Sequence, residues 1–174
     1  MIVAGVKESG KGIRRLFGDT LTALTRRSRI PVMVVPESWV YSPPQGILLG
    51  DDIAADADAH MLDTLLEIAS VFNSKVYVAR VIKRQLQEFL AIMQRPDAVV
   101  SLGETLRVKY EYPVDPDVVH ALGEFADKNA VQMIVMIPHA HFAPERWFIK
   151  GHAWPMIFRT KVPLLLLPGG RDEK

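Results

Sequence analysis

The sequence Ile30-Pro31-Val32-Met33-Val34-Val35-Pro36 returns near the end of the chain as Val162-Pro163-Leu164-Leu165-Leu166-Leu167-Pro168. The match runs back without a gap to Met1-Ile2-Val3 and Met133-Ile134-Val135, so two copies of 36 residues lie 132 positions apart. A fixed interval of this kind indicates a duplicated structural unit. Because the interval has the size of a domain, we interpret the second copy as the end of a complete domain. The first copy is then expected to be the end of another domain whose front is missing.

Apolar runs alternate with segments of helical period from Gly46 onward, which is the pattern of a parallel sheet with crossover helices. Strands are expected at 2–4, 32–35, 47–49, 76–82, 106–112, 133–137 and 162–167. Helices are expected at 61–72, 86–93, 119–126 and 154–159, with a loop around Pro96 and with Asp115-Pro116 opening the third helix. The predicted class is α/β: an open, mainly parallel, five-stranded, Rossmann-like sheet with helices on both faces, joined to an N-terminal β-α-β fragment.

A short polar segment separates the two units. Residues 37–45 are rich in proline and polar side chains, which suits an exposed linker with extended backbone. The predicted organisation is therefore a domain fragment over 1–36, a linker over 37–45 and a complete domain over 46–170.

Composition limits the classes of protein to consider. The chain is 49% hydrophobic and 24% charged with a mean hydropathy of +0.11, it has no apolar run long enough to span a membrane, and no secretion signal is recognisable. We therefore expect a cytoplasmic protein that does not associate with membranes. The net charge of +1 and the absence of a basic run predict no nucleic-acid partner, and the absence of cysteine excludes disulfides and thiolate chemistry.

A glycine-rich segment follows the first strand of the N-terminal copy, and Gly18-Asp19-Thr20 comes later in the same copy. Together with the run from Ile2 to Pro36, this segment resembles the last third of a universal stress protein domain. Members of that family that bind ATP have a strand followed by G-x-x-G and then by a further glycine with Ser or Thr. Gly5 and Gly18 match the outer glycines, and Gly10 lies between them, whereas Glu8 and Asp19 replace the middle glycine and the hydroxyl. These carboxylates argue against ATP here, and the glycines are better explained by tight turns between a strand and helices.

The second copy departs further from the same motif. Ile137, Ala140 and Lys150 stand at the three glycine positions, with Gly151 beside the last of them. Asp51 and Asp52 follow the first strand of the complete domain and resemble the family's nucleotide-facing aspartate, although such a carboxylate also serves as a helix cap. The resemblance implies an adenine-nucleotide fold related to the adenine nucleotide alpha hydrolases. It makes Asp51, Asp52, Ile137, His139, Lys150 and Gly151 the candidate nucleotide ligands of this domain.

Three functions remain open at this stage. The first is a non-enzymatic stress-response module that acts through protein contacts and has weak or lost ATP binding, because no nucleophile, base and orienting acid occur at a recognisable spacing. The second is a genuine adenine nucleotide-binding or slowly ATP-hydrolysing domain that uses Lys150 and Gly151. The third is a metal-binding regulator that uses His139, His141 and His152, although histidines in a loop are more often solvated.

The last strand of each copy is apolar and would form a sheet edge, which must be paired or covered to avoid aggregation. In the resembling family these strands pair antiparallel between domains or subunits. We therefore expect the N-terminal fragment to pack against the complete domain, either within one chain or exchanged in a homodimer. An unidentified protein partner is the remaining expectation.

Overall fold

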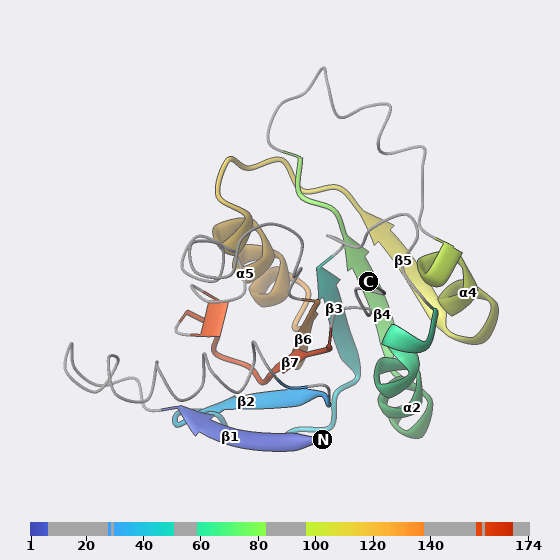
Figure 1. Cartoon of the computed structure of the whole chain (residues 1–174). Helices are drawn as coiled ribbons and strands as arrows, with labels where there is room; N and C mark the ends of the chain where they lie inside the picture. The colour runs from blue at the N-terminus through green and yellow to red at the C-terminus, as the bar shows by residue number, and fades with distance from the viewer. Residues whose placement is uncertain are drawn as a thin grey trace, which may run out of the picture.

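Seven strands form one open sheet in the order β1-β2-β7-β6-β3-β4-β5 (Figure 1). The computed structural model describes residues 1–6, 28, 30–50, 59–82, 97–137, 156–157 and 159–168. The strands are β1 (Ile2–Val6), β2 (Val32–Pro36), β3 (Gly46–Gly50), β4 (Lys75–Ala79), β5 (Arg107–Glu111), β6 (Met133–Met136) and β7 (Leu164–Leu166). The helical elements are the 3-10 helix η1 (Ala59–Leu62) and the α-helices α2 (Asp63–Phe72), α4 (Asp97–Thr105) and α5 (Val118–Lys128).

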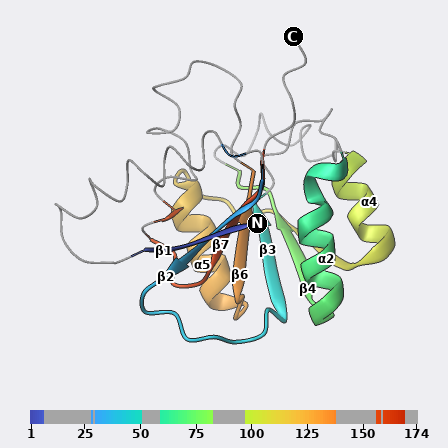
Figure 2. The same cartoon turned by 60° about the horizontal axis from the view of Figure 1, so that its bottom comes forward.

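Helices cover both faces of this sheet, as the sequence predicts (Figure 2). One core lies between α5 and the face that carries Leu48 and Ile134. The other lies between α2, α4 and the opposite face, which carries Leu49 and Val135. Alternate residues of β3 thus enter different cores, and all five residues of this strand are buried, which explains its unbroken apolar run. The class is confirmed as α/β with an open, mainly parallel sheet.

The sequence repeat is also a repeat of strand pairing. β1 pairs parallel with β2, with Ile2 opposite Val32, and β6 pairs parallel with β7, with Ile134 opposite Leu164. These positions are equivalent under the interval of 132 residues. The Ile2 N–H donates to the Pro31 carbonyl at 2.8 Å, and the Ile134 N–H donates to the Pro163 carbonyl at 2.9 Å. The two copies therefore have the same register and the same first hydrogen bond.

A hydroxyl turn precedes the last strand in both copies. The Ser28 hydroxyl donates to the Ile30 carbonyl at 2.6 Å and accepts from the Ile30 N–H at 3.2 Å. The Thr160 hydroxyl does the same with Val162, at 2.7 and 3.2 Å. Such side-chain to backbone hydrogen bonds fix a local turn without the hydrogen bonds of a strand pair. This shared turn explains why a hydroxyl residue stands three positions before the conserved proline of each copy.

The two copies meet along their last strands, which pair antiparallel. Met33 lies opposite Leu165, and Val32 lies opposite Leu166. Met33 and Leu165 are equivalent positions of the repeat, so the pairing has a local two-fold axis through this pair. The remaining strand pairs are all parallel. Strand direction is therefore reversed once, between β2 and β7.

Two local predictions are wrong. Residues 97–105 form α4, where the sequence suggested a loop leading into a strand. Among the side chains of this helix that the structure describes, Val99 and Leu102 are the buried ones, and a stripe of two residues is too short to be seen as a period. The N-cap of α5 is Asp117 instead of Asp115. The expected helix at 86–93 lies outside the described residues.

No helix within the described parts of the chain has the length and apolar character to cross a membrane. Residues of the predicted linker form hydrogen bonds with the residues at the start of β4. The buried Ser74 hydroxyl donates to the Pro44 carbonyl, and the Lys75 N–H donates to the Gln45 carbonyl at 2.8 Å. These bonds align the segment before β3 with the start of β4.

Candidate functional site

The order of connection reverses at β3. From β3 the chain continues to β4 and β5 on one side, and it then returns to β6 and β7 on the other side. Ligands of open α/β sheets bind outside the carboxyl ends of the strands at such a reversal. Because Leu49 lies opposite Val135, the ends of the two strands bring Gly50 and Ile137 into the same region of the carboxyl edge. This region is the candidate site.

The described floor of this region is apolar and closely packed. Ile137 is 5% exposed, and the Leu167 N–H donates to the Met136 carbonyl at 3.0 Å, which ties the end of β6 to the end of β7. A Cβ atom added at Gly50 would lie 3.3 Å from Leu122 Cδ1 and 3.7 Å from Met136 Cγ. A glycine therefore lets the second turn of α5 approach the carboxyl end of β3.

Most of the predicted ligands lie outside the described residues. Asp51 and Asp52 follow Gly50 directly along the chain, and His139, Lys150 and Gly151 come after Ile137. The candidate metal ligands His141 and His152 also lie outside the described ranges. Within those ranges, no three histidine, aspartate or glutamate side chains are grouped as metal ligands.

Gly5 and Ile137 lie toward opposite ends of the strands of the sheet. β1 runs parallel to β2, which is antiparallel to β7, and β7 runs parallel to β6. The carboxyl ends of β1 and β6 therefore point in opposite directions. The carboxyl end of β1, where Gly5 lies, is therefore not at the edge that holds Gly50 and Ile137, and Gly10 and Gly18 of the same copy lie outside the described residues.

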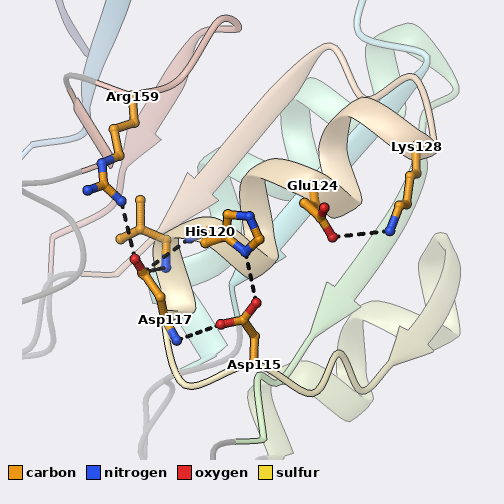
Figure 3. Close-up of polar contacts among 7 residues, drawn as sticks. Asp115, Asp117, His120, Glu124, Lys128 and Arg159 are labelled. Carbon is orange, nitrogen blue, oxygen red and sulfur yellow. Dashed lines mark hydrogen bonds and ion pairs between the residues drawn. The ribbon is translucent and has the colours of Figure 1, made fainter.

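A group of polar side chains surrounds the start of α5, close to the helical turn that contacts Gly50 (Figure 3). One carboxylate oxygen of Asp117 accepts hydrogen bonds from the Val119 N–H at 2.9 Å and the His120 N–H at 3.2 Å. The other accepts from Arg159 Nη1 at 3.2 Å. These bonds hold the pKa of Asp117 below its usual value, the His120 N–H contributing most. Asp117 is therefore an ionised helix cap.

Two basic residues before β7 contact the two ends of α5. Arg159 pairs with Asp117 at the first turn, and Lys161 Nζ lies 2.9 Å from Asp127 Oδ2 at the last. Arg159 thus lies against a carboxylate of the helix cap. A signal for the group was present in the alternating acids Asp115 and Asp117, whereas the contribution of Arg159 comes from far along the chain.

Removal of the cap should destabilise α5. Asp117→Ala is expected to lower the free energy of unfolding by about 1 kcal/mol, because two N–H groups of the first helical turn lose their acceptor. Asp117→Ser should retain most of the stability, since serine also caps. Arg159→Ala should lower it by less than about 1 kcal/mol, because both partners of this ion pair are exposed. Urea denaturation of the three variants measures their free energies of unfolding. Equal losses of stability for Asp117→Ala and Asp117→Ser would contradict the role of Asp117 as a cap.

His120 and Asp115 form a second pair in this group. His120 Nδ1 lies 2.8 Å from Asp115 Oδ2, and Asp115 Oδ1 accepts from the Asp117 N–H at 2.7 Å. The hydrogen bond with Asp115, followed by the charge of that carboxylate, raises the pKa of His120 above its ordinary value of 6.5. The same bond lowers the pKa of Asp115 below its ordinary 3.8.

The pair should stabilise the fold over a limited pH range. The contribution of His120 is full below pH 6.5 and is lost as the pH rises through its native pKa, whereas that of Asp115 is full above pH 3.8 and is lost on acidification through its native pKa. The effect of Asp115→Asn on stability should therefore be largest between these values. An NMR titration should show the His120 pKa above 6.5 in the native protein and lower in Asp115→Asn. An unchanged pKa in the variant would contradict the pairing.

The fold matches solved universal stress proteins, whereas no protein-family model and no curated protein sequence matches the chain. A universal stress protein from Archaeoglobus fulgidus DSM 4304 superposes with a TM-score of 0.68 at 15% identity, over 98% of this chain and 62% of that one. This chain thus spans less than two thirds of that protein. A universal stress protein in complex with cAMP matches with a TM-score of 0.56 at 20% identity, over 74% of this chain and 100% of that one. A universal stress protein from Archaeoglobus fulgidus in complex with dAMP matches with a TM-score of 0.54 at 19% identity, over 76% of this chain and 100% of that one.

Proposed function

We propose that this chain, which has the universal stress protein fold, is a non-catalytic stress-response module that acts through protein contacts and binds an adenine nucleotide weakly. The nucleotide would lie outside the carboxyl ends of β3 and β6. The main support is the reversal of connection between these strands, which brings Gly50 and Ile137 to one edge of the sheet. Two proteins of the same fold were crystallised with cAMP and dAMP.

The residues at this edge favour weak binding. Ile137 stands where the family motif has a glycine, and its side chain packs into the core beneath α2 and α4, so this position lacks the glycine with which the motif holds a phosphate. Nearby, Asp117 is ionised and occupies the N–H groups at the start of α5, so this helix end does not offer an anion site. These features disfavour phosphates more than they disfavour an adenine ring.

Calorimetric titration with ATP, AMP and cAMP tests the proposal. We expect a Kd on the order of 100 μM, or about −5.5 kcal/mol, for at least one of them. Asp51→Ala should abolish the heat of binding. Glu67→Ala, which removes an exposed carboxylate from α2, should leave it unchanged and is the matched control.

The same samples separate the alternatives. Absence of heat with all three nucleotides in the folded protein would overturn the nucleotide part of the proposal. ADP produced from ATP by the native protein but not by Asp51→Ala would overturn the non-catalytic part and favour a slow hydrolase. Nucleotide that binds and is recovered intact agrees with the proposal.

A further inference from the structure

The two faces of β5 are covered differently. Val108 and Tyr110 pack against the core beneath α2 and α4, and the Tyr110 hydroxyl donates to the Val99 carbonyl at 3.1 Å. The core on the α5 side contains no residue of β5 among the described residues. α4 contacts β5, whereas α5 contacts β3, which lies two strands away from β5. The α5 side of β5 is therefore an open strip of sheet beside that helix.

This open strip carries basic side chains. Arg107 and Lys109 alternate with the packed residues of β5, so both lie on the open side. The register places Lys75 of β4 opposite Arg107, and Tyr77 opposite Lys109. Neighbouring strands are about 4.8 Å apart and alternate residues about 6.6 Å apart, so the three basic residues begin within roughly 8 Å of one another. We call Lys75, Tyr77, Arg107 and Lys109 the basic strip.

Protection of a sheet edge does not account for all of this charge. Lys109 Nζ lies 2.6 Å from Glu111 Oε1, and a charged pair of this kind hinders the addition of another strand to β5. Lys75, however, belongs to an inner strand, and its Nζ lies 4.6 Å from the centroid of the Tyr77 ring. Arg107 has no ion pair within the described part of the chain. Two cations of the strip thus lack a carboxylate partner among the described residues.

The Tyr77 hydroxyl is a second, independent sign of a ligand. Tyr77 is 9% exposed, and the Phe125 ring packs edge-on against it at a centroid distance of 5.3 Å. Buried tyrosines usually use their hydroxyl in a hydrogen bond, but this one has no such partner among the described residues. Glu111 raises the pKa of Lys109 most, through a hydrogen bond and its charge, and the ionisable Tyr77 phenol adds to this rise. The phenol is therefore close to Lys109 and available to an anionic group on the strip.

The strip is defined by described residues alone. It lies toward the amino ends of β4 and β5, and the residues that lead into these ends, 73–74 and 105–106, are described. The residues that follow α5, 129–132, are described as well, and the Gln132 N–H donates to the Gly46 carbonyl at the amino end of β3. The candidate nucleotide region lies at the carboxyl ends of the strands, so the two surfaces are separate.

We propose that the basic strip binds an extended acidic segment of a partner protein, with Glu or Asp at every second position. Such a segment repeats its carboxylates about every 6.6 Å, which matches the step from Arg107 to Lys109. One carboxylate would lie between Arg107 and Lys75, where the guanidinium group can donate two parallel hydrogen bonds. The next would lie beside Lys109 and accept from the Tyr77 hydroxyl. This inference rests on the proposed action through protein contacts and names the chemistry of the partner.

A nucleic acid fits this surface less well than an acidic polypeptide. Glu111 closes the row of cations on β5 and would repel a continuous line of phosphates. The net charge of the chain is only +1, so no wider basic field supports the strip.

Fluorescence anisotropy with a labelled peptide of alternating threonine and glutamate tests the proposal on the full chain. We expect a Kd on the order of 100 μM at low ionic strength, increasing roughly tenfold at high ionic strength because exposed charges are screened. The matched peptide with glutamine in place of each glutamate should not bind.

Variants of the protein show whether binding occurs at the strip. Arg107→Gln and Lys75→Gln should each raise the Kd by about tenfold or more. Lys161→Gln removes the same charge from a side chain that is 76% exposed before β7, and it should leave the Kd within about twofold. Tyr77→Phe retains the ring but loses the hydroxyl, so the Kd should rise by about threefold to tenfold. A tyrosine with a structural role alone would give no change.

Several outcomes would overturn the inference. Absence of peptide binding, an unchanged Kd in Tyr77→Phe, or an equal loss in Lys161→Gln would each do so. Displacement of the peptide by millimolar inorganic phosphate would assign the strip to a small anion, and tighter binding of an oligonucleotide of the same charge would assign it to nucleic acid. ATP calorimetry of Arg107→Gln should match that of the native protein, so failure of this inference is distinct from failure of the nucleotide site.

Discussion

Leu165→Ala is expected to lower the free energy of unfolding by about 2–5 kcal/mol, the range for truncation of a fully buried leucine. Leu165 is 0% exposed and lies between two neighbouring strands, opposite Met33 on one side and Val135 on the other. Its side chain belongs to the core beneath α2 and α4. The truncation would leave a cavity at the place where the two copies of the repeat meet.

The equivalent residue of the other copy is a matched control. Met33 is only partly buried and packs at the margin of the same core, so Met33→Ala should lower stability by clearly less. Urea denaturation followed by circular dichroism measures both variants. Equal losses would contradict the asymmetry of the two copies, and a negligible loss for Leu165→Ala would contradict the central position of β7.

Gly50→Val should lower the free energy of unfolding by about 1–3 kcal/mol through overpacking. The Cβ atom alone would meet Leu122 Cδ1 at 3.3 Å, Met136 Cγ at 3.7 Å and the Val135 carbonyl oxygen at 3.8 Å. The two methyl groups of valine would crowd the buried Leu122 side chain, which would have to shift. Thermal unfolding of the variant measures this effect.

Gly103 gives the control for the same substitution. A Cβ atom there has nothing within 4 Å, and the residue is exposed on α4. Gly103→Val should change stability by less than about 0.5 kcal/mol, because valine is at least as good a helix former as glycine. If the two valine variants unfolded at the same temperature, the close approach of α5 to Gly50 would be wrong.

The sequence predicted the positions of all seven strands to within a few residues, because most of them are dense aliphatic runs, while β5 alternates charged residues with Val108 and Tyr110. β3 and β7 illustrate this, since their central residues are all aliphatic and all buried. The ends were less certain: the expected strand at 76–82 stops at Ala79, and Ile82 forms only an isolated bridge with Val114. A strand ends where its ladder ends, and the residue types do not determine that position.

The start of α5 shows why local signals can mislead. Asp115, Pro116 and Asp117 offer two carboxylates, either of which could cap the helix by sequence. In the structure the cap is Asp117, which also pairs with the distant Arg159, whereas Asp115 pairs with His120 of the first helical turn. α4 was missed for a related reason: Val99 and Leu102 are buried by η1 and β5, which the helix's own sequence does not reveal.

The candidate site was predicted in part. The carboxyl ends of β3 and β6 follow from the order of strands and crossovers, so Gly50 and Ile137 could be assigned to one edge from sequence. The polar group at α5 could not be assembled in this way, because Arg159 is 42 positions from Asp117 and only the packing of the segment before β7 brings it close. The predicted ligands Asp51, Asp52, His139, Lys150 and Gly151 remain predictions.

The antiparallel contact of β2 with β7 lies within one chain, and this has a consequence for how the molecule behaves on dilution. The same contact between separate chains would dissociate as the concentration fell below its Kd. Here the covalent connection supplies an effective concentration on the order of millimolar, whatever the amount of protein in solution. The paired copies should therefore remain together at nanomolar concentration, as a tethered pair whose stability is a property of the single molecule.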